Sequence, residues 1–130
     1  THPDIGKIDD RARLEDEIVT AGEELQQFLS RPVRYFAFPF GLPANMQPAA
    51  FELAFEAGYD GVCSAYGAYN FPGDDPFHLQ RIHADEDLLR VRNWLSVDPR
   101  KLDVPRYQYQ QPVPTAAAAP LLEQSPQIGV

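Results

Sequence analysis

The feature that most constrains this chain is a regular alternation between helix-like and strand-like segments. Apolar residues recur at three- and four-residue steps from Asp9 or Asp10, either of which can cap a helix, to about Leu29. Residues 33–40 are instead rich in Val, Tyr and Phe, which predicts a strand. The same signals predict a helix at about 48–57, a strand at about 59–65, a loop at 66–76, a strand at about 79–83 and a helix at about 86–96. This alternation predicts an α/β fold with parallel strands.

The pattern also predicts which faces of these elements are buried. The first helix carries one apolar stripe, formed by Leu14, Ile18, Ala21, Leu25 and Phe28. Its acidic residues lie on the other faces and are interpreted as a solvated surface without chemistry. The first strand is apolar on both faces, as expected for a parallel strand that helices cover on both sides. The last helix has an apolar side made of Leu88, Leu89, Val91, Trp94 and Leu95.

Length and composition predict one packed domain followed by a tail. A chain of 130 residues, with 44% hydrophobic and 23% charged residues, can form one modest core. We assign this core to a domain spanning residues 1–104. From about residue 105 the sequence becomes rich in Pro, Gln and Ala, and such a segment buries too little apolar surface to offset its ordering entropy. Residues 105–130 are therefore predicted to be a flexible tail or linker.

Charge and hydropathy exclude several classes of partner. The net charge of −8 argues against nucleic acid, because the basic residues are scattered except for a loose group, Arg90, Arg92, Arg100 and Lys101. No apolar run approaches the roughly 20 residues that cross a bilayer, so no transmembrane segment is expected, and no signal peptide is visible. A neutral or acylated sugar would not be repelled. The single cysteine, Cys63, excludes an internal disulfide and is interpreted as a small buried hydrophobe. The cellular compartment stays open.

Four short motifs, in this order, resemble one enzyme family. They are Thr-His-Pro-Asp-Ile at 1–5, Phe-Ala-Phe-Pro-Phe-Gly at 36–41, Ala-Gly-Tyr-Asp at 57–60 and Leu-Gln-Arg-Ile at 79–82. Together with the helix between the first two, they resemble the polysaccharide deacetylases, the NodB-homology type also called carbohydrate esterase family 4. The resemblance covers about residues 1–97 and corresponds to the C-terminal part of the catalytic domain.

The resemblance implies a distorted (β/α) barrel, of which this chain holds the later units. It also implies hydrolysis of an N-acyl group, or as second choice an O-acyl group, on a saccharide, with a divalent metal: zinc first, cobalt or nickel as alternatives. The family's early strand with its paired aspartates, and the first histidine of its metal pair, have no counterpart in these residues. We therefore expect the chain to need the N-terminal part of the same domain as its partner, and to be inactive alone.

The resemblance assigns three residues to metal binding and acyl hydrolysis. His2 matches a metal-ligating histidine, whose imidazole suits zinc. The backbone N–H of Phe40 would contribute to the oxyanion site. Classical members carry an arginine where this chain has Ala37, so the orientation of the catalytic base would fall to another residue, and Arg81 is the candidate.

The general acid and the sugar contacts complete the predicted site. The family's late histidine, which protonates the leaving amine, would correspond to His83 or to His78, although each can also be an ordinary histidine. Pro39 and Gly41, on either side of Phe40, are predicted to contact substrate. In the following loop, Asn70 could hydrogen-bond a sugar hydroxyl and Tyr69 could stack on a sugar face. Loop packing explains Tyr69 equally well, and it explains Asn70 better than a sugar contact does.

Two other interpretations stay open from the sequence. The Ala37 replacement and the lack of a clean Leu-x-His motif favour a non-catalytic barrel that binds a glycan or a protein partner. The second is a plain α/β fragment in which the motifs occur by chance. Upstream sequence with paired aspartates and a histidine four residues before His2 would favour the enzyme.

Overall fold

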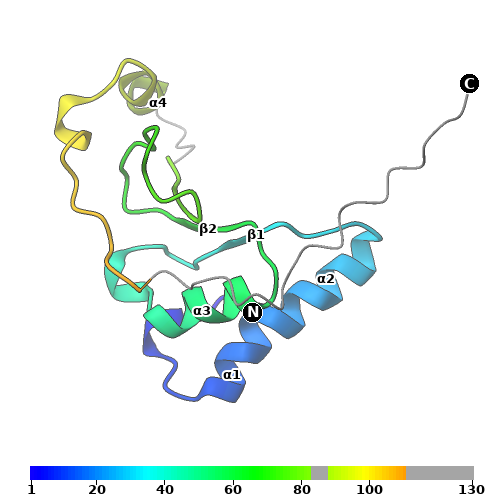
Figure 1. Ribbon diagram of the computed structural model, residues 1–130. Helices are drawn as coiled ribbons and strands as arrows, with labels where there is room; N and C mark the ends of the chain where they lie inside the picture. Colours follow the sequence, from blue (N-terminus) through cyan, green and yellow to red (C-terminus); the bar gives the residue numbers. More distant parts are fainter. Residues whose placement is uncertain (83–87, 111–130) are drawn as a thin grey trace, which may run out of the picture.

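The structure of the protein is a computed structural model that describes residues 1–82 and 88–110 (Figure 1). Its helices and strands follow one another in this order: α1 (Arg11–Glu15), a π-helical section (Asp16–Thr20), α2 (Ala21–Leu29), β1 (Tyr35–Ala37), α3 (Pro48–Glu56), β2 (Gly61–Ser64), β3 (His78–Gln80) and α4 (Leu88–Leu95). Short 3-10 turns occur at Ile5–Lys7, Pro43–Asn45 and Pro99–Lys101. Each helix and strand predicted within the described residues is therefore present, with shorter strands.

The three strands form one parallel sheet in the order β1-β2-β3. Phe36 lies opposite Val62, which in turn lies opposite His78, so these three side chains share one face of the sheet. The α/β prediction with parallel strands is thus confirmed. Over the described residues the sheet is open and does not close into a barrel.

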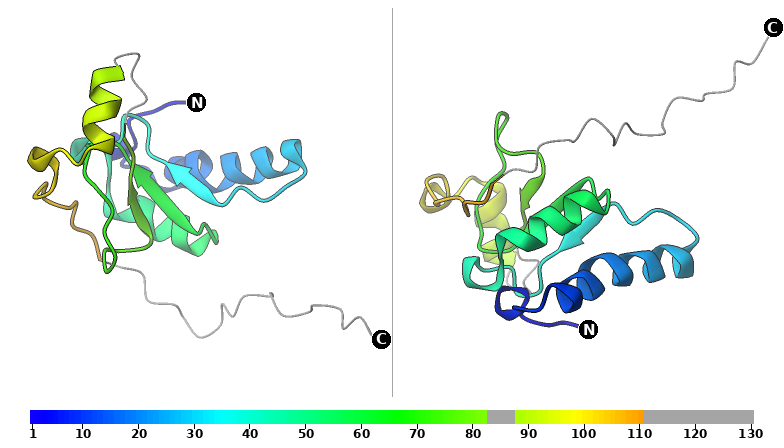
Figure 2. Two further views of the ribbon diagram at one scale, coloured as in Figure 1. Left: turned by 90° about the horizontal axis from the view of Figure 1, so that it is seen from above. Right: turned by 60° about the horizontal axis from the view of Figure 1, so that its bottom comes forward.

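The structure confirms the predicted start of the first helix, but only part of the predicted apolar stripe is buried. The Asp10 side chain caps the helix by accepting a hydrogen bond from the Ala12 N–H at 3.0 Å. Leu14 and Ile18 are fully buried, whereas Phe28 is 85% exposed. The π-helical section explains the break, because its i→i+5 bonds change the phase of the helix and rotate the stripe of α2 away from the core. Figure 2 shows α2 running out beyond the sheet.

The core lies between the α1-to-α2 helix, α3 and one face of the sheet (Figure 2). Helix α3 starts at Pro48, where the missing N–H costs nothing, and stops before Gly58, which adopts a positive φ of 82°. Its Phe51 is completely buried and contacts Phe38, which follows β1. The remaining core side chains are Ile5, Ile8, Leu14, Ile18, Met46, Ala50, Leu53, Ala54 and Val62.

The opposite face of the sheet is more open than predicted. Tyr35 and Ala37 alternate with the core-facing Phe36 and are exposed, so the expectation that helices cover both faces of the first strand is wrong here. The predicted apolar side of the last helix is likewise only partly buried. Trp94 is buried, but Leu88 is 80% exposed and Leu95 is 76% exposed.

Packing continues beyond residue 104, where the predicted domain ends. Tyr107 and Tyr109 both stack on Phe51, with ring centroids 5.6 and 3.9 Å away, and join the core cluster. Tyr107 also donates a hydrogen bond from its backbone N–H to the Tyr66 hydroxyl at 3.0 Å. The rest of the predicted tail, residues 111–130, and the predicted general acid His83 lie outside the described residues.

Candidate functional site

A cleft of about 750 Å³ lies where the C-terminal ends of the strands meet the first residues of the chain. In parallel α/β sheets this edge is where several strand ends can each contribute a functional group. The lining residues are Thr1, His2, Pro3, Ile5, Glu17, Phe36, Ala37, Phe38, Pro39, Phe40, Ala65, Arg81 and Ile82. The cleft therefore brings together His2, Pro39, Phe40 and Arg81, four of the predicted site residues.

Phe40 is held in a strained conformation at the edge of this cleft. Its φ is +60°, and the Gly41 N–H bonds the Pro39 carbonyl at 2.6 Å, which makes Phe40 the central residue of a γ-turn. Such a conformation costs a non-glycine residue on the order of 1–3 kcal/mol and often marks a functional site. Within residues 1–82 and 88–110, no acceptor bonds the Phe40 N–H, so this donor remains available.

Gly41 supports the turn by allowing a close approach. Its φ is +68°, and a Cβ atom at this position would lie 2.6 Å from the Ala65 backbone nitrogen. The Gly41 carbonyl in turn accepts a hydrogen bond from the Ala65 N–H at 2.8 Å. Pro39 has no N–H to donate, which helps to end β1 after Ala37 rather than at residue 40 as predicted. The hydrogen bond between Gly41 and Ala65 holds the segment that follows β1 to the end of β2.

Arg81 reaches across the ends of all three strands. It follows β3, its Nε donates to the Ser64 carbonyl at 3.3 Å, and its terminal nitrogen donates to the Phe38 carbonyl at 3.2 Å. A guanidinium carries five N–H donors, so three remain for other partners. Because Phe38 directly follows β1, the Arg81 guanidinium reaches the C-terminal end of that strand.

His2 is exposed and lies against Phe40, with the two rings edge to face at a centroid distance of 4.9 Å. Glu17 also lines the cleft, and its carboxylate accepts a hydrogen bond from the Thr1 hydroxyl. No group of three His, Cys, Asp or Glu side chains that could hold a metal ion occurs within residues 1–82 and 88–110. One imidazole does not hold a catalytic metal in a defined geometry.

Glu17 is a cleft residue that sequence reasoning did not identify. It belongs to a helix whose acidic side chains were all assigned to a solvated surface. The π-helical section, which contains Glu17, changes the direction in which its residues project, and π-bulges are often found at functional sites. No sequence pattern predicts this π-helical section. The sequence alone therefore could not show that Glu17 lines a cleft while Glu15 and Asp16 do not.

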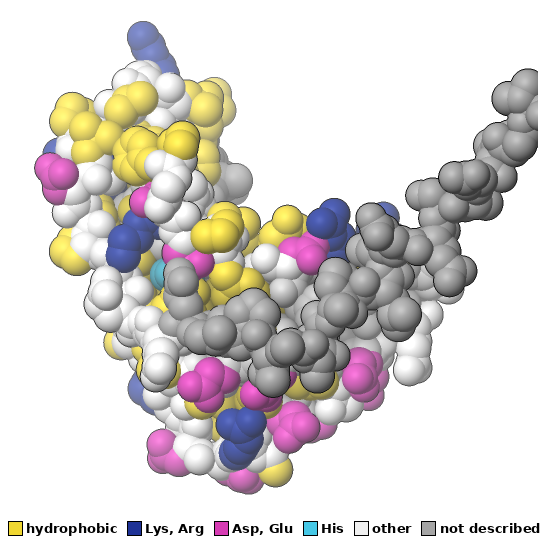
Figure 3. Space-filling view, in the orientation of Figure 1, with side chains coloured by type: hydrophobic (Ala, Val, Ile, Leu, Met, Phe, Trp, Pro, Cys, Tyr) yellow, Lys and Arg dark blue, Asp and Glu magenta, His cyan; other side chains and the backbone are white. Residues whose placement is uncertain are grey.

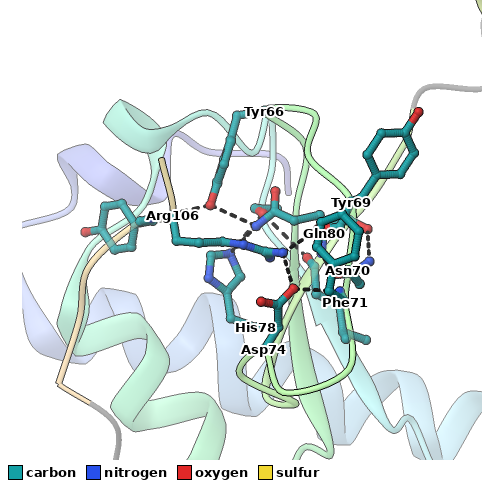
Figure 4. Close-up of polar contacts among 11 residues, drawn as sticks. Tyr66, Tyr69, Asn70, Phe71, Asp74, His78, Gln80 and Arg106 are labelled. Atoms are coloured by element: carbon teal, nitrogen blue, oxygen red, sulfur yellow. Dashed lines mark hydrogen bonds and ion pairs between the residues drawn. The ribbon is translucent and has the colours of Figure 1, made fainter. Parts of the chain in front are cut away.

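Asn70 and Tyr69, predicted to contact sugar, use their polar groups within the fold, and Figure 4 shows the Asn70 contacts with Gln80. The Asn70 amide donates to the Gln80 carbonyl at 2.9 Å and accepts from the Gln80 N–H at 2.8 Å. The Tyr69 hydroxyl donates to the Trp94 carbonyl at 2.7 Å and accepts from the Asp98 N–H at 2.8 Å. Neither residue lines the cleft.

His78 is a buried histidine on the core side of the sheet (Figure 4). Its Nε2 lies 2.9 Å from the Ser64 hydroxyl and 3.2 Å from the Gln80 amide nitrogen, and its ring packs edge to face on Phe51. Only 3% of the side chain is exposed, and burial lowers its pKa from 6.5 to about 4. His78 is therefore neutral at neutral pH, and it does not line the cleft.

Comparisons with known proteins give no relative. No protein-family model matches the chain, and neither a curated protein nor a solved structure is significantly similar to it. Among residues 1–82 and 88–110, no helix combines the length and apolar character needed to span a membrane.

Proposed function

We propose that this chain forms one side of an active site that hydrolyses an N-acyl group on a saccharide, with an O-acyl group as the second choice. Its elements would be the later units of a distorted (β/α) barrel of the polysaccharide deacetylase type. The proposal takes the reaction from the resemblance of the four motifs. Its physical support is the cleft, which gathers His2, Phe40 and Arg81 from three distant parts of the sequence.

The observation that carries the proposal is the available N–H of Phe40 in its strained γ-turn. Acyl hydrolysis passes through a tetrahedral intermediate with a negatively charged oxygen. A backbone donor fixed before the reaction stabilises that oxygen without reorganisation. The hydrogen bond between Gly41 and Ala65 holds the turn to the sheet, so the donor keeps its position.

Two charged side chains complete the chemistry that the described residues can supply. The Glu17 carboxylate can accept a proton from an attacking water, as a general base. Arg81 keeps donors free after bonding two strand-end carbonyls and can orient a carboxylate or a substrate oxygen. A divalent metal would polarise the acyl carbonyl, but His2 and Glu17 are too few ligands to hold one.

The test is acetate release from an N-acetylated chitooligosaccharide by the complete gene product, with zinc, cobalt or nickel supplied. We expect Glu17→Gln to lower the rate at least about a hundredfold, the usual contribution of a positioned base. We expect His2→Ala to lower the rate by a similar factor, because it removes a ligand of the supplied metal. Glu15→Gln is the matched control, because Glu15 lies on the same helix and outside the cleft. Wild-type-like rates in both cleft variants would contradict the proposal.

A second candidate is a non-catalytic domain that binds a glycan or a protein partner. Ala37 favours it, because it stands where the resembled family carries an arginine. Amide shifts of Phe40, Gly41 and Ala65 on addition of the chitooligosaccharide would report binding in the cleft. Such binding by the complete gene product, without acetate release under any of the three metals, would select this second function.

A further inference from the structure

We infer that a second pocket beside the cleft binds an oxyanion group, a carboxylate or sulfate, carried by the saccharide that occupies the cleft. The pocket measures about 560 Å³. Its lining residues are Leu42, Ala65, Tyr66, Gly67, Leu89, Arg90, Asn93, Trp94, Asp98, Arg100 and Lys101. The part of this inference that concerns the saccharide rests on the proposed function.

The two hollows adjoin at the C-terminal end of β2. Ala65 lines both of them, and the chain passes from the cleft to the pocket between Phe40 and Leu42. Gly41, between Phe40 and Leu42, lies close against Ala65. A saccharide whose acylated unit lies at Phe40 would therefore extend its neighbouring unit towards the pocket.

The pocket offers a cation to a ligand although the protein is strongly acidic. Among the described lining residues, Arg100 is paired with Asp98, and Lys101 supplies a further positive charge, whereas the whole chain has a net charge of −8. Figure 3 shows many of the visible Asp and Glu side chains on the lower part of the molecule, over α1 and α3, away from α4. Local positive charge of this kind attracts anions that the rest of the surface repels.

Lys101 is the cation best placed to receive a ligand. Its ammonium lies 5.5 Å from the centre of the Trp94 ring, and it forms no ion pair with a carboxylate anywhere in residues 1–82 and 88–110. Arg100 is held differently, because its guanidinium bonds both Asp98 oxygens, at 2.9 and 2.7 Å. Asp98 thus orients Arg100 while leaving Lys101 to an incoming anion.

The walls of the pocket are tied together by contacts within the fold and leave room for a ligand. Gly67 has a φ of +80°, and a Cβ atom there would lie 3.2 Å from the Trp94 ring and 3.5 Å from the Lys101 ammonium. A side chain at this position would fill the space beside the cation. The Trp94 backbone is tied to the Tyr69 hydroxyl at 2.7 Å, and the two rings pack edge to face. An anion would therefore meet a preformed site, which lowers the entropic cost of binding.

The test uses Trp94 as a reporter, because it is the single tryptophan of the chain and lies beside Lys101. Its fluorescence is followed while wild-type protein is titrated with three probes: a uronic-acid oligosaccharide, a neutral chitooligosaccharide of equal length, and inorganic sulfate. We expect a saturable change with the acidic oligosaccharide at concentrations where the other two probes bind at least about tenfold more weakly.

Lys101→Met removes the charge and keeps an apolar stem on the Trp94 ring, so the fold should be retained. It should weaken binding of the acidic oligosaccharide about tenfold, the usual worth of one charge-assisted contact. Arg92→Met removes an equal charge from α4 outside the pocket and should leave binding unchanged. Equal affinities in wild type and Lys101→Met would overturn the anion site.

If sulfate binds as tightly as the acidic oligosaccharide, the saccharide source of the anion is refuted. Because binding is measured by the fluorescence of Trp94, the result does not depend on catalysis. Absence of acetate release with an intact Trp94 response would refute the proposed reaction and leave the anion site standing, whereas the reverse result would refute the anion site alone.

Discussion

At the scale of single residues, two glycines with similar backbone angles should respond very differently to the same substitution. Gly41 and Gly58 have φ values of +68° and +82°. A Cβ atom at Gly41 would lie 2.6 Å from the Ala65 nitrogen, whereas nothing lies within 4 Å of one at Gly58. Gly58→Ala should therefore cost only the left-handed strain, about 1 kcal/mol. Gly41→Ala should cost at least about 2 kcal/mol more, because the two strand ends must move apart.

Urea unfolding of the two variants measures this difference directly. If Gly41→Ala and Gly58→Ala lower the free energy of unfolding equally, the Gly41–Ala65 contact does not exist in solution. Amide shifts at Phe40 should also change in Gly41→Ala alone, because that turn depends on the same contact.

His78 should make stability depend on pH in the mildly acidic range. Burial lowers its pKa from 6.5 to about 4, and the nearby Arg106 acts in the same direction while Asp75 opposes it. Between these two values the unfolded chain binds a proton that the folded chain does not. The free energy of unfolding should therefore be constant above about pH 7 and fall by up to about 3 kcal/mol as the pH drops to 4.

The measurement is urea unfolding at intervals from about pH 7.5 to about pH 4.5. This range covers most of the interval between the unfolded and the folded pKa of His78. His78→Gln keeps a polar group beside Ser64 and should show a much flatter profile than wild type. His2→Gln, at an exposed position, should keep the wild-type profile. A His78→Gln profile as steep as that of the wild type would contradict the assignment.

At the scale of single residues, the sequence motifs predicted only some of the residues that line the cleft. The motif at 36–41 pointed to the strand end, and the structure places His2, Phe40 and Arg81 at one cleft. The roles of Asn70 and Tyr69 could not be separated from loop packing, because the same amide and hydroxyl groups serve both. Their hydrogen bonds to Gln80 and Trp94 depend on contacts that sequence periodicity does not report.

At the scale of elements, the segment 105–110 should contribute to stability although its composition resembles a linker. The Tyr109 ring lies 3.9 Å from the Phe51 ring and its hydroxyl donates to Asp75. Removal of a half-buried aromatic side chain should cost about 2–4 kcal/mol. Tyr109→Ala should therefore unfold at clearly lower urea concentration than Gln110→Ala, which changes an exposed neighbour. Equal midpoints would show that the segment does not pack on α3.

The existence of the elements could be predicted, but their exposure could not. Periodicity and capping residues located the described α-helices and strands, because these signals are local. They did not predict the π-helical section or the short 3-10 turns. The outward rotation of α2 depends on the π-helical section, and the exposure of Leu88 and Leu95 depends on where α4 lies relative to the sheet. Both are consequences of tertiary packing, on which a single sequence carries little information.

At the scale of the whole molecule, the two edges of the sheet are protected unequally. On β3, the Asn70 side chain bonds both the N–H and the carbonyl of Gln80, as a neighbouring strand would. On β1, the backbone groups of Phe36 face β2, so those of the alternate residues Tyr35 and Ala37 point to the outer edge, which no other strand of the described residues covers. An open, apolar strand edge is a template for pairing with another chain.

The 130-residue chain should therefore associate through β1 as its concentration rises. Tyr35 is half exposed on this edge, and the Phe28 side chain of α2, which is 85% exposed, adds apolar surface. Tyr35→Lys places a charge on the edge, a device that natural sheets use against strand pairing. In sedimentation velocity, wild type should shift to larger species with concentration, and Tyr35→Lys should remain monomeric. Gln27→Lys adds the same charge at an exposed position of α2 and should behave as wild type. A monomeric wild type at all concentrations, or equal association of both variants, would show that β1 is not the pairing edge.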